Sequence, residues 1–182
     1  MLIFINRGET VKLDIGCGPK CKKGFIGVDY NKYNSDIKYV IDLNKNKLPF
    51  KNNKITEIYC SHTLEHLDKL FQLVHEFYRV LSPGGKCIIK VPYFRHYQAF
   101  QPHHKTFWGL GTENIFNNKY SEFEFKWSKT KLSWNFINQS EDKLWIILLP
   151  ILNYIIKKYK GIYERKISLI FPIYELEFEL IK

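Results

Sequence analysis

Two glycines and an acid supply groups that could bind a nucleotide. Residues 13–18 (LDIGCG) end a short apolar run at Gly16 and Gly18, and Asp29 ends the next run, 11 residues after Gly18. Glycines after a first strand let backbone N–H groups approach a ligand closely. An acid at the end of the second strand is where Rossmann-like folds bind a ribose diol. The spacing predicts a site for a ribose-bearing cofactor.

The elements around these residues alternate between strand and helix patterns. We expect strands at 11–15, 25–30, 37–43, around 57–60 and at 86–93. Between the last two, apolar residues recur every three or four positions over 64–81, which predicts an amphipathic helix capped by Ser61 or Thr63. The turn residues SPGG at 82–85 end it. Strand, helix and strand in this order indicate a parallel α/β sheet.

The second half has a different pattern. An aromatic and histidine-rich segment covers about 93–120, a strand is expected from about 122, and a helix from about 142 to 159. The C-terminal strand alternates apolar residues with Glu175, Glu177 and Glu179, which predicts a solvated face and an antiparallel position. No repeat or linker divides the chain, so we expect one domain over 1–182.

At this point the chain resembles the class I S-adenosylmethionine (SAM)-dependent methyltransferases, in particular a small type-11-like family. The resemblance is carried by DIGCGP, GFIGVDY, DLN, LPF, SHTLEHL and EFYRVLSPGGKCIIKVPY, and covers residues 11–92 closely. It implies a Rossmann-like seven-stranded, mostly parallel sheet with an antiparallel last strand. SAM would lie across the carboxyl ends of the first, second and fourth strands.

The same resemblance assigns cofactor-binding roles. The glycine loop would cradle the methionine part of SAM, Asp29 would bind the ribose hydroxyls, and Asp42 with Leu43 would lie beside adenine. Ser61 and His62 match the loop after the fourth strand. The expected cofactor site is therefore Asp14, Gly16, Cys17, Gly18, Asp29, Tyr30, Asp42, Leu43 and Ser61.

One departure from the family concerns the first crossover. Only residues 19–24 (PKCKKG) separate the glycine loop from the second strand, which leaves room for barely one helical turn. We therefore expect a shortened crossover made of a loop or a single turn.

Methyl transfer asks mainly for alignment of acceptor, methyl group and sulfur, since the sulfonium is already activated. An oxygen or nitrogen acceptor also needs a base. His104 and His62 are the candidate catalytic residues, followed by His66. The aromatic segment, which includes Trp108, is expected to form a lid over the acceptor.

Composition leaves the acceptor open. The formal net charge of +10 favours a phosphorylated or otherwise anionic partner. The absence of an added recognition domain favours a small molecule, and nucleic acid is allowed but not favoured. The apolar run at 144–156 (LWIILLPILNYII) is too short to span a bilayer, and its proline interrupts a continuous helix. Peripheral membrane contact and the oligomeric state stay open.

The cysteines bear on location. Four scattered cysteines without a CxxC pair argue against a zinc site and favour reduced thiols in a cytoplasmic protein.

Three other interpretations compete. Residues 62–66 spell H-x-x-E-H, a zinc-protease motif, but no third ligand is indicated, and we expect no metal. A nicotinamide-dependent dehydrogenase would need a third glycine. The serious alternative is a catalytically silent SAM-fold subunit or nucleic-acid-binding partner.

Overall fold

The computed structural model describes residues 11–116, 125–133 and 143–182. Seven strands form one sheet in the order β3-β2-β1-β4-β5-β7-β6. Their bounds are β1 Val11–Ile15, β2 Ile26–Asp29, β3 Ile37–Val40, β4 Ile55–Ser61, β5 Leu81–Pro92, β6 Lys126–Ser133 and β7 Glu175–Ile181.

The pairing confirms the predicted fold class. β1 is parallel to β2 and β4, and β4 is parallel to β5, so these strands all end at one edge of the sheet. β7 inserts antiparallel between β5 and β6. No helix forms between β1 and β2, as the shortened first crossover predicted.

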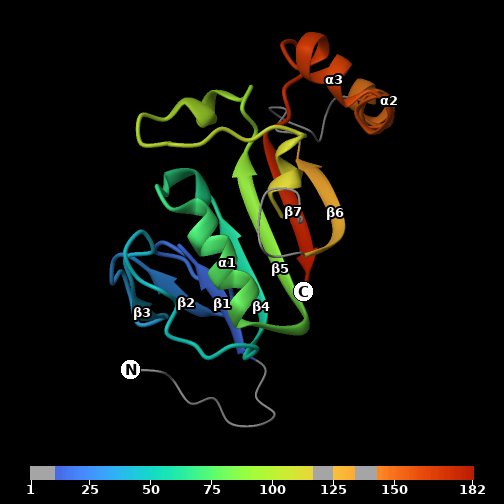
Figure 1. The fold of residues 1–182 in the computed structure, drawn as a ribbon. Helices are drawn as coiled ribbons and strands as arrows, with labels where there is room; N and C mark the ends of the chain where they lie inside the picture. Colours follow the sequence, from blue (N-terminus) through green and yellow to red (C-terminus); the bar gives the residue numbers. More distant parts are fainter. Residues whose placement is uncertain (1–10, 117–124, 134–142) are drawn as a thin grey trace.

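One face of the sheet carries the apolar core. Helix α1 (Leu70–Val80) packs here through Leu73, Val74 and Phe77, and each fully buried side chain of this size contributes about 1.5–3 kcal/mol. Figure 1 shows α1 lying along the sheet in front of β4 and β5.

The predicted start of that helix was wrong. The chain makes only a 3-10 turn at Leu64–His66, and α1 begins at Leu70 without a side-chain cap from Lys69. Asn44, in the loop after β3, instead accepts hydrogen bonds from the amides of Asp68 (2.9 Å) and Lys69 (3.4 Å). This tertiary contact satisfies the two amides that come just before the first helical residue.

The glutamates of β7 do not form the solvated face that their alternation predicted. β7 is an interior strand, so their side chains meet lysines of both neighbours. Glu175 is 6% exposed and lies 2.9 Å from Lys90 of β5, and Glu177 lies 2.7 Å from Lys131 of β6. These cross-strand pairs of opposite charge stabilise the partly buried glutamates.

The remaining elements gather at the edge where the parallel strands end. Figure 1 shows the segment after β5 arching over the end of α1, with α2 (Lys143–Lys158) and α3 (Lys160–Ile162) at the same edge. Short 3-10 turns lie at Tyr97–Phe100 and Thr112–Phe116, and a π-helical turn at Tyr163–Ile167.

Pro150 does not interrupt α2, contrary to the sequence expectation. A proline removes one N–H group from the hydrogen-bond ladder of a helix, but here the helix continues on both sides of Pro150. Leu152 and Ile156, which follow it, pack into the core. Within the described residues, none of the helices combines the length and apolar character that crossing a bilayer requires.

Candidate active site

A cavity of about 360 Å³ opens at the carboxyl ends of β1, β2 and β4. This is the edge at which parallel α/β sheets bind their ligands. Its lining residues are Gly16, Asp29, Tyr30, Ile41, Asp42, Leu43, Asn44, His62, Thr63, His66 and Leu67. Five of the nine predicted cofactor residues, Gly16, Asp29, Tyr30, Asp42 and Leu43, are therefore brought together.

Gly16 is required by both backbone and packing. Its φ is +67°, in the left-handed region, and a Cβ built there would lie 2.1 Å from Oγ1 of Thr63. The Thr63 hydroxyl donates to the carbonyl oxygens of Ile15 and Ser61. The glycine loop is thus fixed against the loop that follows β4, which the sequence pattern alone did not indicate.

Asp29 fixes the shape of the cavity beside the glycine loop. Its carboxylate accepts hydrogen bonds from the amides of Gly18 (2.8 Å) and Asn31 (3.0 Å). Gly18 also has a positive φ, of +59°, with open space where a side chain would lie. A ligand can therefore approach the backbone at Gly18 while Asp29 stays ordered beside it.

Asp14 and Cys17 order the loop and do not line the cavity. Asp14 is buried and accepts a hydrogen bond from the amide of Lys22 (2.7 Å), and burial raises the pKa of its carboxyl. The Cys17 thiol packs with Cys21 against Gly27, and burial raises its pKa as well. These contacts hold the short crossover against β2.

Asp42 and Tyr30 lie at the open side of the cavity. Asp42 pairs with Lys45 at 3.1 Å, and this contact lowers the pKa of its carboxyl. Tyr30 is largely exposed. Ser61 ends β4 but is not among the lining residues; its carbonyl oxygen instead holds Thr63.

His62 borders the cavity in a charged cluster that sequence reasoning missed. Its φ of +50° is uncommon for a non-glycine residue and is found most often at functional sites. Its Nε2 lies 2.8 Å from Glu175, and its Nδ1 lies 3.3 Å from the buried Glu65. Lys90 joins the cluster at 2.9 Å from Glu175. Glu175 is 113 residues away in the chain, so no local pattern could reveal it.

The charge of His62 argues against its predicted role as a base. The Glu175 carboxylate, and then Glu65, raise the pKa of the imidazole to about 9. The ring is therefore protonated at neutral pH and has no lone pair to accept a proton. It can donate hydrogen bonds or face a negative charge.

His104 lies outside the lining of this cavity but next to it. Its ring is 4.7 Å from that of His66, which does line the cavity. Burial lowers the pKa of His66, so its ring is held neutral. His66 thus faces the cavity and does not close the core as a helix residue.

The aromatic segment divides into core and surface. Trp108 is 2% exposed and lies against Phe116 and Phe178, with ring centroids 6.2 and 6.0 Å away. It is a core residue of the segment that is expected to form the lid, and its ring is not exposed to an acceptor. Tyr97 and Phe107 are exposed and are available to contact an acceptor.

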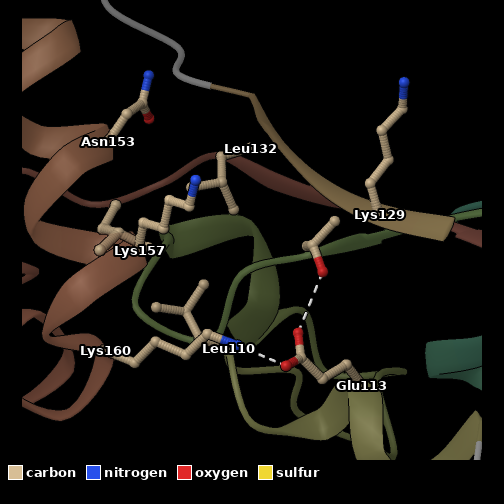
Figure 2. Close-up of a pocket in the computed structure, with 9 residues that line it drawn as sticks. Leu110, Glu113, Lys129, Leu132, Asn153, Lys157 and Lys160 are labelled. Atoms are coloured by element: carbon tan, nitrogen blue, oxygen red, sulfur yellow. Dashed lines mark hydrogen bonds and ion pairs between the residues drawn. The ribbon is translucent and has the colours of Figure 1, made fainter. Parts of the chain in front are cut away.

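A second cavity, of about 700 Å³, lies between α2, β6 and the segment around Leu110 (Figure 2). It combines apolar side chains with three lysines and is lined by Leu110, Glu113, Lys129, Thr130, Leu132, Asn153, Ile156, Lys157 and Lys160. Glu113 binds Thr130 and pairs with Lys160, as the dashed lines show. Lys129 lies 3.8 Å from Glu179, so among the described residues Lys157 is the lysine of this cavity without an ion pair.

Comparison with known proteins agrees with this geometry. A family model described as a methyltransferase domain matches residues 13–89, which include β2, β3, β4 and α1 and most of β1 and β5. This part of the chain is therefore similar to a methyltransferase domain. A 43-residue stretch is 40% identical to a ubiquinone/menaquinone biosynthesis C-methyltransferase, UbiE, from Desulfotalea psychrophila. That stretch is 24% of this chain and 18% of the relative.

Solved structures show the same fold over nearly the whole chain. A SAM-dependent methyltransferase from Archaeoglobus fulgidus is 20% identical, with a TM-score of 0.61, over 96% of this chain and 87% of that one. One from Mesorhizobium loti is 14% identical, with a TM-score of 0.59, over 96% and 92% of the two chains. The family match over residues 13–89 and the shared fold both agree with the predicted resemblance to the class I SAM-dependent methyltransferases.

Proposed function

We propose that this methyltransferase transfers a methyl group from SAM to a small acidic acceptor, with phosphorylated compounds as the first class to test. The observation that carries the proposal is the cavity at the carboxyl ends of β1, β2 and β4. It brings Gly16 of the glycine loop together with two carboxylates, Asp29 and Asp42, whose hydrogen bonds already hold them in place.

On the donor side, Asp29 is the ribose-binding residue. Two adjacent hydroxyls can each donate to an ionised carboxylate, and each charge-assisted bond contributes about 1.5–3 kcal/mol. Asp42 and Leu43 lie where adenine would contact the loop after β3. The backbone of the glycine loop lies where the methionine part would bind, while Asp14, Cys17 and Ser61 act on this site through the loops they order.

On the acceptor side, the second cavity supplies charge and apolar surface together. Lys157 suits an anionic group, and the apolar side chains of Leu110, Leu132 and Ile156 suit an apolar portion of the same molecule. The segment at about 93–120 is proposed to cover the acceptor, with the exposed Tyr97, Phe100 and Phe107 as its contacts.

The transfer itself needs few protein groups. A lone pair of the acceptor attacks the methyl carbon, the carbon–sulfur bond breaks, and S-adenosylhomocysteine leaves as a neutral thioether. Alignment of this kind can supply about 7–11 kcal/mol of the barrier reduction. The proton lost by an oxygen or nitrogen acceptor goes to a base, for which His104 is a better candidate than the protonated His62.

The acceptor proposal is tested with radiolabelled SAM and pairs of small molecules that differ only in a phosphate group. We expect methyl transfer to the phosphorylated member, with KM rising about tenfold in Lys157→Ala, or about 1.4 kcal/mol. Lys158→Ala is the matched control, because Lys158 contacts Tyr154 and does not line the cavity. Equal use of both members would contradict the acidic-acceptor proposal.

A catalytically silent SAM-binding subunit is the second candidate. One observation favours a silent subunit. His62, one of the two candidate bases, is protonated and cannot accept a proton. Binding of S-adenosylhomocysteine without methyl transfer to any acceptor class would support it. For either function we propose a cytoplasmic location, which the free thiols of Cys17, Cys21, Cys60 and Cys87 support.

A further inference from the structure

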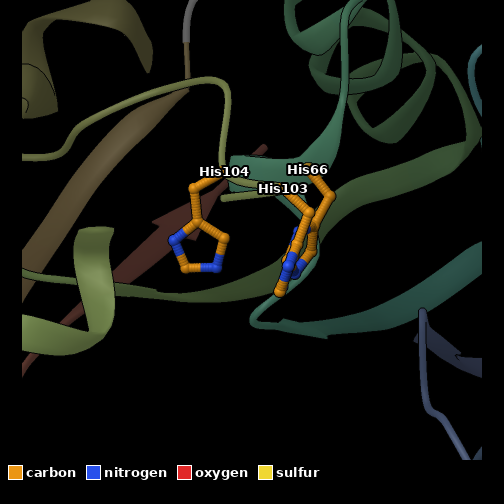
Figure 3. Close-up of side chains that lie close together, drawn as sticks. All are labelled: His66, His103 and His104. Atoms are coloured by element: carbon orange, nitrogen blue, oxygen red, sulfur yellow. The ribbon is translucent and has the colours of Figure 1, made fainter. Parts of the chain in front are cut away.

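Three histidines from two distant segments meet beside the cavity at Asp29, which we call the donor cavity because SAM is proposed to bind there. His66 ends the 3-10 turn after β4, while His103 and His104 belong to the segment after β5. Their ring centroids are 4.8 Å apart for His66 and His103, 4.7 Å for His66 and His104, and 5.1 Å for the remaining pair. Figure 3 shows the His66 and His103 rings overlapping in this view, with the His104 ring beside them. One ring nitrogen of each lies within 4.8 Å of the other two.

Backbone and side-chain contacts hold the two segments together independently of the rings. The amide of Lys105 donates to the carbonyl oxygen of Glu65 at 2.7 Å, next to His66. The Lys105 ammonium lies 2.5 Å from Asp68. These contacts bring the histidine-bearing segment onto the 3-10 turn, so the convergence of the imidazoles is fixed by the fold around them.

The tautomer of His104 is set by a hydrogen bond. Its Nδ1 lies 3.2 Å from the carbonyl oxygen of Ala99, which can only accept, so Nδ1 carries the hydrogen. Nε2 then has a free lone pair. A histidine that binds a metal is commonly oriented in this way, with its other ring nitrogen donating to a backbone carbonyl.

We propose that His66, His103 and His104 form a binding site for one divalent transition-metal ion of the zinc type. Zinc–nitrogen distances of about 2.0–2.1 Å place tetrahedral ligand nitrogens about 3.4 Å apart. The observed separations need only a modest closure, and the exposed His103 is free to rotate inward. Three histidines leave a coordination position open, as in catalytic zinc sites.

The position of the site suggests what the open coordination position holds. His66 lines the donor cavity, so the ion would lie at the border between SAM and the acceptor segment. A bound acceptor oxygen or nitrogen would be oriented toward the methyl group, and His104 would then act through the ion. This role rests on the proposed function, whereas metal binding itself does not.

Metal binding is tested with untagged protein stripped by a chelator and then titrated with Co²⁺ and Zn²⁺. We expect one ion per chain, a visible Co²⁺ absorption typical of a low coordination number, and a micromolar or lower Kd. His103→Gln should weaken binding at least tenfold, since it removes one of three ligands. His103 is exposed, so this variant should fold normally, which a thermal melt checks. His75→Gln, on the exposed face of α1, should bind as the wild type does.

Three results would overturn the proposal: no binding by the wild type, equal binding by His103→Gln, or an equal loss in His75→Gln. Thiolate absorption bands in the Co²⁺ complex would also overturn it, because they would place the ion at Cys17 and Cys21, whose sulfurs lie near Asp14. Calorimetry with S-adenosylhomocysteine on the metal-free protein separates the two claims. Binding there without metal binding would leave the methyltransferase proposal intact.

Discussion

The charge of His62 depends on Glu175, and the substitution Glu175→Gln tests that dependence. The variant keeps the shape of the side chain and its hydrogen-bonding capacity but removes the charge that lies 2.8 Å from Nε2. Glu65, at 3.3 Å, remains as the second partner. We expect the pKa of His62 to fall from about 9 toward its ordinary value of 6.5 by one to two units.

The size of the effect follows from the contacts. A rise from 6.5 to about 9 corresponds to about 3 kcal/mol favouring the charged ring, at 1.36 kcal/mol per unit. The His62 side chain is 39% exposed, so solvent screens this interaction, and we expect about 1–2 kcal/mol in stability. Because the pKa is raised by folding, this stability is fully present below pH 6.5. It is lost as the pH rises through about 9.

The assay is an NMR titration of the His62 ring protons in the wild type and in Glu175→Gln, together with denaturant unfolding at pH 6 and pH 9.5. The wild type should lose more stability than the variant between the two pH values. Glu177→Gln is the matched control. Glu177 lies on β7, as Glu175 does, but it pairs with Lys90 and Lys131. A wild-type His62 that titrates near 6.5 would refute the reasoning and restore this residue as a candidate base.

Three further predictions concern folding and the cavity. Gly16→Ala should abolish S-adenosylhomocysteine binding and destabilise by about 2–3 kcal/mol, because of its positive φ and the contact with Thr63; Gly18→Ala, with open space around it, should cost about 1–2 kcal/mol, and equal costs in denaturant unfolding would contradict the packing argument. Trp108→Ala should destabilise by about 3–5 kcal/mol, whereas Phe107→Ala, at an exposed site, should change stability by less than about 0.5 kcal/mol; the reverse order in thermal melts would return Trp108 to the surface. Arg79→Lys should cost about 2 kcal/mol in unfolding free energy, since the guanidinium bonds to Glu76 and to the carbonyl oxygens of Leu48 and Phe50; an exposed control, Arg165→Lys, should be neutral.

Local patterns predicted the parts of the fold that local forces decide. The strands of the parallel half, the missing first-crossover helix and the antiparallel last strand followed from apolar runs, glycines and the family motifs. The start of α1 did not, because the amides before it are satisfied by Asn44 from another loop. The charged face of β7 did not either, since its burial depends on lysines from β5 and β6.

The candidate site divides in the same way. Gly16 and Asp29 were predicted from strand ends and spacing and Asp42 from the family motifs, and all three line the cavity. Thr63 and Glu175 were missed, since their contacts to Gly16 and His62 are tertiary. The expectation of no metal rested on the absence of a third ligand near His62 and His66. The fold brings His103 and His104 to His66, while His62 turns toward Glu175 instead.

The central claim, that the cavity at Asp29 binds SAM, is tested most directly by calorimetric titration with S-adenosylhomocysteine. The wild type should bind in the micromolar range, and Asp29→Ala should bind tenfold to a hundredfold more weakly, about 1.4–2.8 kcal/mol. Asp36→Ala, an exposed acid in the loop before β3, should match the wild type. No binding by the folded wild type, or equal affinity in Asp29→Ala, would contradict the account.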